Sequence, residues 1–236
     1  MSLALAARDL IRGILERRGW QARRLADAHF LRVHEVDCVF DVGANRGQFA
    51  AALRRRGYRG RIVSLEPLAG PFAELANAAS GDPLWSVRNC AAGAAPGEAE
   101  IAVAELDVFS SFKPVSAVGS DYDPRSRTVA RQRVPVVTLD TLAANFPCER
   151  PFLKIDTQGF EREVLAGAAG LLERAEGLLL ELPVENLYDG VWTFGEAIAH
   201  LDALGFQPAH FDPVCPVPGD PASAMELDAL FRRKRG

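Results

Sequence analysis

The clearest chemical signal in the sequence is the segment Asp41-Val-Gly-Ala-Asn-Arg-Gly47, followed along the chain by Glu66. Glycine at positions 43 and 47 lets the backbone turn tightly and approach a ligand without an intervening Cβ atom. A carboxylate such as that of Glu66 can accept hydrogen bonds from both hydroxyls of a ribose. The two features together predict a site for a cofactor that contains adenosine.

Two adenosine cofactors have to be distinguished at this site. The dinucleotide fingerprint G-x-G-x-x-G would place glycine at positions 43, 45 and 48, whereas the sequence has Asn45 and Gln48. A pyrophosphate would meet side chains where it needs bare backbone. S-adenosylmethionine has no pyrophosphate, so we favour it over NAD. A turn that binds no ligand is the remaining alternative, and the acid at Glu66 argues against it.

A second group of polar residues stands in two apolar segments further along the chain, Lys154-Ile-Asp-Thr-Gln-Gly159 and Leu178-Leu-Leu-Glu-Leu182. Strand alternation places Lys154 and Asp156 on the same side. Glu181, in so apolar a run, must be paired or face a wet crevice. We predict that Asp156 and Glu181 are the catalytic residues, as a base or as ligands of a substrate hydroxyl.

Two alternatives remain open for these acids. Asp156 precedes a helix and can instead be its N-cap. Asp156 and Glu181 together can also bind a divalent cation. We do not favour the cation, and we assign no metal ligand.

These residues have to be positioned by strands and helices that alternate along the chain. The apolar pattern predicts strands over 38–42, 61–65, 84–91, 152–156 and 177–182, and helices over 46–56, 70–79, 160–173 and 194–204. Such alternation is typical of an α/β fold with a mostly parallel sheet and helices on both of its faces.

Three regions depart from the alternation. Residues 3–18 and 20–34 have helical patterns and predict an N-terminal helical extension. Residues 98–105 look like an antiparallel strand, and the polar residues 113–133 predict a long surface loop. The strand-like segments 206–214 and 225–231 are joined by a proline-rich connection too short for a helical crossover, which predicts an antiparallel hairpin.

Several of these segments, in this order, resemble the FkbM family of methyltransferases. The resemblance rests on Phe40-Asp-Val-Gly-Ala-Asn-Arg-Gly-Gln-Phe49, Leu65-Glu-Pro67, Asn89 with the following Ala-Ala-Gly, Ser110-Ser111, Val136-Val-Thr-Leu-Asp140, Leu153-Lys-Ile-Asp-Thr-Gln-Gly-Phe-Glu161 and Leu227-Asp-Ala-Leu-Phe231. It implies a Rossmann-like class I methyltransferase fold with a seven-stranded sheet, S-adenosylmethionine as cofactor, and methylation of a hydroxyl of a sugar, polyketide or other secondary metabolite.

We expect one methyltransferase domain over residues 1–236, with 1–36 as the helical extension and 37–236 as the Rossmann-like core. Asn89, at the end of the third strand, is expected to meet the adenine edge, although an asparagine there can also simply form a turn. The predicted cofactor-binding residues are Asp41, Gly43, Ala44, Asn45, Gly47, Glu66, Pro67 and Asn89. Gln158 departs from the resemblance, because the family more often has glutamate there; this leaves the metal and the substrate open.

The composition argues against some classes of binding partner. The chain has 236 residues, with 27 lysines and arginines against 31 acids, and a net charge of −4. This balance argues against a broad nucleic-acid surface, and no apolar run is long enough to span a membrane. We expect a cytoplasmic enzyme that acts on a small-molecule hydroxyl, has no nucleic-acid or membrane partner, and can form a homodimer.

Two other functions were weighed against this one. A nucleic-acid methyltransferase usually has an Asn/Asp-Pro-Pro-aromatic loop after the fourth strand, where this chain has Asp156-Thr-Gln-Gly159. A catalytically inactive domain that binds a partner through its N-terminal helices would have no need of Gly43, Gly47 and Glu66 together. Both remain alternatives to the O-methyltransferase.

Overall fold

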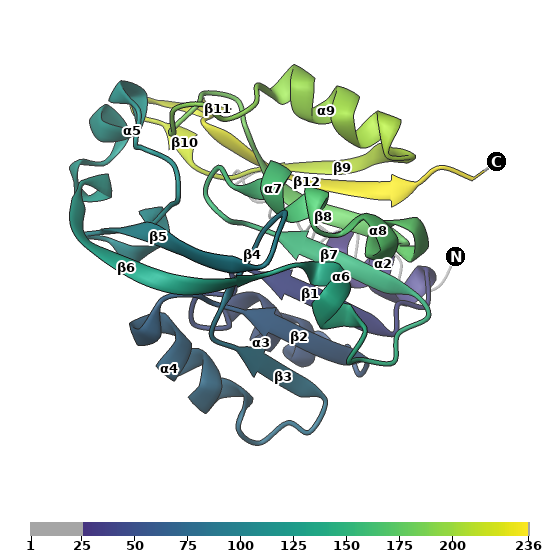
Figure 1. Cartoon of the computed structure of the whole chain (residues 1–236). Coiled ribbons are helices and arrows are strands. Elements are labelled where there is room, and N and C mark those ends of the chain that lie inside the picture. The colour runs from purple at the N-terminus through teal and green to yellow at the C-terminus, as the bar shows by residue number, and fades with distance from the viewer. Residues whose placement is uncertain (1–25, 236) are drawn as a thin grey trace, which may run out of the picture.

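A mixed sheet forms the centre of the computed structural model, which describes residues 26–235 (Figure 1). Its strand order is β3-β2-β1-β7-β8-β12-β9. Of these strands, only β12 runs in the direction opposite to the others. The predicted seven-stranded, mostly parallel sheet is therefore confirmed. The strands are β1 (Cys38–Val42), β2 (Arg61–Leu65), β3 (Trp85–Arg88), β7 (Pro151–Ile155), β8 (Gly177–Pro183), β9 (Phe206–Pro213) and β12 (Glu226–Arg233).

Helices cover both faces of this sheet. One apolar core lies under α6 (Leu139–Ala143), α7 (Glu161–Ala166), α8 (Ala169–Arg174) and α9 (Phe194–Ala203). The other lies under α2 (Ala26–Val33), α3 (Gln48–Arg55) and α4 (Ala69–Ala79). In β1, Phe40 points into the first core and Val39 into the second. Burial on both sides explains why the parallel strands read as continuous apolar runs.

The strand order reverses between β1 and β7. From β1 the chain goes on to β2 and β3 at one edge of the sheet, and from β7 it goes on to β8 on the other side. Open α/β sheets bind ligands outside the carboxyl ends of their strands at such a reversal. This point in the sheet lies directly after Val42 and Ile155, where the segments Asp41–Gly47 and Lys154–Gly159 leave their strands.

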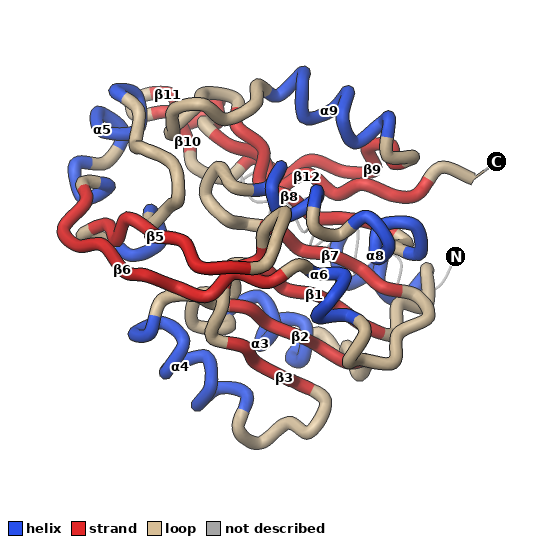
Figure 2. Tube along the Cα trace, viewed as in Figure 1, coloured by secondary structure: helices blue, strands red, loops and turns tan. Residues whose placement is uncertain are grey.

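A second, smaller sheet corrects the prediction of a surface loop over 113–133. Its strands are β4 (Ala91–Ala92), β5 (Gly97–Ala104) and β6 (Thr128–Val137), in the order β4-β6-β5 (Figure 2). Residues 128–133 belong to β6 and pair antiparallel with β5, as expected for 98–105. The loop prediction was wrong there because these side chains are mostly exposed; burial begins only at Val134. The connection also contains η1 (Asp107–Phe109), α5 (Ala117–Tyr122) and η2 (Pro124–Ser126).

The predicted helix over 160–173 is two helices, α7 and α8, which meet at Gly167. A Cβ atom at Gly167 would lie 2.0 Å from the carbonyl oxygen of Gly93. The backbone after β4 therefore passes against this point, and the helix breaks where only glycine fits. Similarly, the strand expected over 84–91 divides into β3 and β4, which belong to different sheets.

The C-terminal hairpin is confirmed. β9 and β12 pair antiparallel, and β10 (Pro216–Val217) and β11 (Asp220–Ala224) form a short two-stranded extension of their connection. At the other end, α2 lies within the predicted helix 20–34, whereas the predicted helix 3–18 falls outside the described residues. Within residues 26–235, no helix is both long and apolar enough to cross a membrane.

Candidate active site

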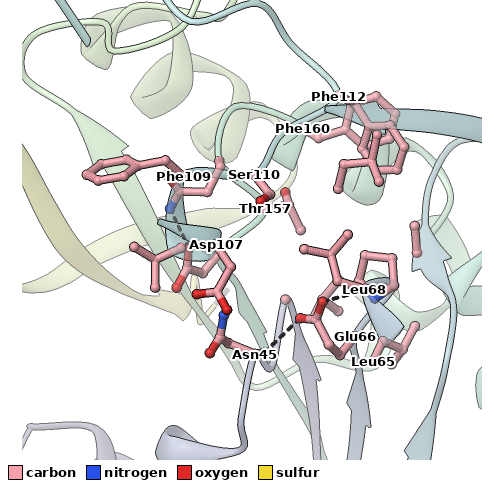
Figure 3. A pocket seen from close by; sticks show the side chains of 18 of the residues that line it. Asn45, Leu65, Glu66, Leu68, Asp107, Phe109, Ser110, Phe112, Thr157 and Phe160 are labelled. Carbon is pink, nitrogen blue, oxygen red and sulfur yellow. Dashed lines mark hydrogen bonds between the residues drawn. The ribbon is translucent and has the colours of Figure 1, made fainter. Parts of the chain in front are cut away.

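A cavity of about 250 Å³ opens at the carboxyl ends of β1, β2, β7 and β8. One end of it is apolar, and Phe112 and Phe160 lie together on that wall with ring centroids 4.7 Å apart (Figure 3). The apolar lining includes Leu65, Leu68, Ala91, Ile101, Phe112 and Phe160. A flat heteroaromatic ring fits such a surface, because desolvation and contact with aromatic faces both favour its burial.

Glu66 lies on the wall of this apolar end. Its Oε2 accepts the backbone N–H of Asn45 at 2.9 Å, and its Oε1 accepts that of Leu68 at 2.8 Å (Figure 3). Burial raises the pKa of Glu66, and these two hydrogen bonds oppose the rise. Each carboxylate oxygen keeps a second lone pair. The carboxylate can therefore accept two further hydrogen bonds, as the predicted contact with a ribose diol requires.

The glycine loop stands beside Glu66, and the cavity wall includes Gly43, Asn45 and Pro67. A Cβ atom at Gly43, where φ is +73°, would lie 1.8 Å from the carbonyl oxygen of Asp156. This glycine is therefore required first by the close approach of the backbone after β7. Gly47, where φ is +84°, packs against Leu75 and Trp85, away from the lining.

Asp41 lies behind the cavity rather than in its wall. Its fully buried carboxylate accepts the Ser64 hydroxyl at 3.0 Å and lies 3.5 Å from Nζ of Lys154. Burial raises the pKa of Asp41, and the Lys154 ammonium opposes the rise. The position of Asp41 supports a role in holding Lys154, and through it the cavity wall.

Asn89 also stands behind the lining. Its Nδ2 donates to the carbonyl oxygens of Glu66, at 2.9 Å, and Pro67, at 3.0 Å. The side chain thus holds the turn that carries Glu66. The residues that follow it, Cys90 and Ala91, line the cavity instead. The predicted segment therefore reaches the cavity, but the amide of Asn89 is used by the protein's own backbone.

The other end of the cavity is polar. Its wall includes Asp156, Gln158, Glu181, Cys215 and Glu226. A second cavity of about 290 Å³ also reaches Asp156 and Glu181, and Ala44, Lys154 and Asp228 belong to its lining. The two acids predicted to be catalytic therefore come together at the junction of two cavities.

Lys154 joins the acids of neighbouring strands. Its Nζ lies 3.3 Å from Oδ2 of Asp156 and donates to the carbonyl oxygen of Gly43 at 3.0 Å. Burial alone would lower the pKa of Lys154, but the carboxylates of Asp156 and Asp41 raise it above its usual range. The ammonium is therefore held charged beneath the glycine loop.

Asp156 is not the N-cap of α7, because Phe160 holds that position and makes no side-chain cap hydrogen bond. The buried Oε1 of Glu161 accepts the backbone N–H groups of Thr157, at 3.0 Å, and Gly159, at 3.1 Å. Glu161 thus reaches back from the first turn of α7 to close the loop that precedes it. The carboxylate of Asp156, with 36% of its side chain exposed, faces the cavities instead.

Gln158 and Tyr188 are among the site residues to which the sequence analysis gave no role. Nε2 of Gln158 donates at 2.9 Å both to Oδ1 of Asp156 and to Oε2 of Glu181. The hydroxyl of Tyr188 donates to Oε1 of Gln158 at 2.8 Å. The departure of Gln158 from the family pattern was a usable signal; Tyr188 offered none, because its loop has no periodic pattern.

Glu226 adds a third acid from the far end of the chain. It is buried at the start of β12, opposite Pro183 of β8, and burial raises its pKa to about 7. Burial, together with the charges of Asp156 and Glu226, also raises the pKa of Glu181 well above its usual range. At neutral pH this end of the cavity can therefore both hold and accept protons.

One trio in the described part of the chain has the spacing of metal ligands. Donor atoms of Glu181, Cys215 and Glu226 all lie within 4.8 Å of one another. Burial raises the pKa of the Cys215 thiol to about 12. Metals bind the thiolate, so an ion at this trio would have to displace the thiol proton.

The 107–112 segment covers the cavity and is fastened to the glycine loop. Nη1 and Nη2 of Arg46 donate to the two carboxylate oxygens of Asp107, at 3.0 and 2.5 Å. This bidentate pair holds the pKa of Asp107 below its usual value. The Ser111 hydroxyl donates to the carbonyl oxygen of Gln158 at 2.5 Å. One cover thus contacts both the loop after β1 and the loop after β7.

Comparisons with known proteins bear on the family and the fold. The family profile described as the methyltransferase FkbM domain matches residues 41–208. The chain is also similar to the crystal structure of methyltransferase FkbM from Methylobacillus flagellatus KT, with 15% identity and a TM-score of 0.53 over 84% of this chain. It spans 43% of the length of that protein. No curated protein matches the sequence.

Two further solved structures are similar at lower scores. A precorrin-6y C5,15-methyltransferase from Geobacter metallireducens GS-15 is 12% identical, with a TM-score of 0.49 over 92% of this chain and 89% of its own. The magnesium protoporphyrin IX methyltransferase of Synechocystis PCC 6803 is 10% identical, with a TM-score of 0.48 over 89% of this chain and 77% of its own.

Proposed function

The chain belongs to the FkbM methyltransferase family. We propose that it is an S-adenosylmethionine-dependent O-methyltransferase acting on a small molecule. The acceptor we propose is a hydroxyl of a sugar or of another secondary-metabolite scaffold. One observation carries the proposal: a single cavity joins the carboxylate of Glu66 to the carboxylates of Asp156 and Glu181. A ribose-binding acid and two proton-accepting acids thus share one ligand site.

The residues of the apolar end fit the adenosine part of S-adenosylmethionine. Glu66 would accept the ribose hydroxyls, and the apolar wall around Phe112 would contact the base. Gly43 and Asn45 would lie toward the amino-acid end, where no pyrophosphate has to be accommodated. When bound, S-adenosylmethionine supplies an electrophilic methyl group on a sulfonium.

The polar end fits an acceptor hydroxyl. Attack by an alcohol oxygen requires a group that takes its proton, and positioning supplies much of the remaining rate enhancement. Asp156 is the base in this proposal, because its carboxylate faces the cavity and is held by Lys154 from below. Glu181 is its partner and orients the hydroxyl.

The charge of the polar end favours a small-molecule acceptor over a nucleic acid. Three acids, Asp156, Glu181 and Glu226, line it, and the nearby ammonium of Lys154 is engaged with Asp41 and Asp156. Base flipping calls for a basic channel, whereas this wall is lined by acids. A hydroxyl group, in contrast, hydrogen-bonds readily to carboxylates.

Calorimetric titration with S-adenosylmethionine, S-adenosylhomocysteine and NAD tests the cofactor. We expect the first two to bind and NAD not to bind. Incubation of the enzyme and S-adenosylmethionine with a panel of glycosides and polyketides, followed by mass spectrometry, tests the acceptor. A product heavier by one methylene unit supports the proposal; binding of NAD alone would overturn it.

A further inference from the structure

The amide of Gln158 lies between the two carboxylates of the polar end. Its nitrogen has two N–H donors, and both are used at 2.9 Å, one on Asp156 and one on Glu181. Asp156 follows β7 and Glu181 lies in β8, so this one side chain connects the acids of two neighbouring strands. Two acids that share a site usually need a cation or a shared proton between them.

The orientation of this amide is fixed from both sides. Its Oε1 accepts the hydroxyl of Tyr188 at 2.8 Å, so a flipped amide would turn its oxygen toward two carboxylates. Its backbone is held as well, because φ of Gln158 is +55° and its carbonyl oxygen accepts the Ser111 hydroxyl at 2.5 Å. A non-glycine residue persists in this left-handed region only where its surroundings hold it there.

The amide bridges the two acids as a cation would, but it adds no charge. It donates to both acids, and its hydrogen bond opposes the rise in the pKa of Glu181 that burial and Asp156 cause. Asp156 has Lys154 as a second partner at 3.3 Å. A carboxylate oxygen that accepts one N–H keeps a further lone pair. Each acid therefore retains capacity for a hydroxyl in the cavity.

We propose that Gln158 is a positioning residue that takes the place of a divalent cation between Asp156 and Glu181, so that the two carboxylates hold the acceptor hydroxyl without a metal ion. This inference rests on the proposed methyl transfer. It goes further in assigning the role of cation to a neutral side chain. A cation bound at the position of the amide nitrogen would displace the amide and break its hydrogen bond to Tyr188.

Manganese binding to the full-length protein tests this directly, with free Mn²⁺ followed by electron paramagnetic resonance in the presence of S-adenosylhomocysteine. We expect Gln158→Glu, which brings a third carboxylate to the same point, to raise the Mn²⁺ affinity by roughly tenfold or more over the wild type. Gln207→Glu is the matched control, because it makes the same change in β9 beside Arg232. It should leave the affinity unchanged.

The inference is overturned if the wild-type protein binds Mn²⁺ as tightly as Gln158→Glu and loses it in Asp156→Asn. If circular dichroism shows that Gln158→Glu does not fold, the turnover of the wild-type enzyme tests the inference instead. Turnover that is unchanged by a strong chelator supports the inference, and turnover lost to the chelator and restored by Mn²⁺ overturns it. Failure of the proposed function looks different, because S-adenosylmethionine would then not bind or no acceptor would be methylated.

Discussion

The carboxylate of Asp41 and the ammonium of Lys154 lie 3.5 Å apart, on adjacent strands and directly beneath the site. Asp41 is fully buried, and 11% of the Lys154 side chain is exposed. Removing one partner of a buried pair leaves a charge without compensation, which costs about 3–5 kcal/mol. The pair therefore links the stability of the fold to the position of Asp156.

The first prediction concerns this pair. Lys154→Met should lower the free energy of unfolding in urea by about 3–5 kcal/mol. The double variant Asp41→Asn/Lys154→Met should recover part of the loss, because the carboxylate no longer needs a partner. Arg127→Met breaks an exposed pair with Glu105 and should cost less than about 1 kcal/mol. Equal losses in the two single variants would contradict the coupling.

The second prediction concerns Glu66. Glu66→Gln keeps a side chain of the same size but replaces one acceptor oxygen by an N–H₂ group. The affinity for S-adenosylhomocysteine should fall by about tenfold to a hundredfold, the size of a lost charged hydrogen bond. Calorimetry measures the change. Glu98→Gln, at an exposed position in β5, is the control and should bind as the wild type does.

The third prediction separates binding from chemistry. Asp156→Asn should lower kcat for the acceptor by about a hundredfold or more, since general bases contribute that much, and leave the affinity for S-adenosylhomocysteine close to that of the wild type. Single-turnover kinetics and calorimetry check the two quantities. If both fall together, Asp156 supports the cofactor rather than the acceptor, and the assignment of the base is lost.

These acids illustrate what sequence could predict and what it could not. The pattern of apolar strand ends placed Glu66, Asp156 and Glu181 near one another, and they line one cavity, because parallel strands bring their carboxyl ends to one edge. Asp41 lies on the same face of the sheet but deeper, because it is in register with Ser64 and Lys154, which come two residues before Glu66 and Asp156. The pattern of β1 does not reveal this, since the strand is buried on both faces.

Contacts from distant segments were beyond prediction for a different reason. Glu226 joins Glu181 only because β12 inserts between β8 and β9. The hydrogen bond from Tyr188 to Gln158 depends on a loop whose sequence has no periodic apolar pattern. Residues 128–133 were missed as a strand because their partner, β5, pairs with them through the backbone while their side chains stay exposed.

The fourth prediction follows from the pKa of Glu226, which burial raises to about 7 from an ordinary value of 4.5. Between these two values the unfolded chain has released a proton that the folded chain retains. The free energy of unfolding should therefore fall as the pH rises from 4.5 to 7, by about 3 kcal/mol from this group. Urea unfolding across this range should show a weaker fall in Glu226→Gln. An identical pH profile in the variant would assign the effect to other acids.

The last prediction distinguishes two costs of replacing glycine. Gly43 and Gly57 both have positive φ, +73° and +93°. A Cβ atom at Gly57 meets no atom of residues 26–235 within 4 Å, so Gly57→Ala should cost only the left-handed strain, about 1–2 kcal/mol. A Cβ atom at Gly43 would lie 1.8 Å from the carbonyl oxygen of Asp156, and no side-chain movement can relieve a clash with backbone.

Gly43→Ala must therefore push the loops after β1 and β7 apart. We expect it to lose more stability than Gly57→Ala and also to weaken S-adenosylhomocysteine binding, because both loops line the cavity. Urea unfolding and calorimetry on the two variants measure these effects. If the two alanines were equal in both measurements, the close approach of Gly43 to Asp156 would have no energetic consequence, and the two loops would not form one rigid wall.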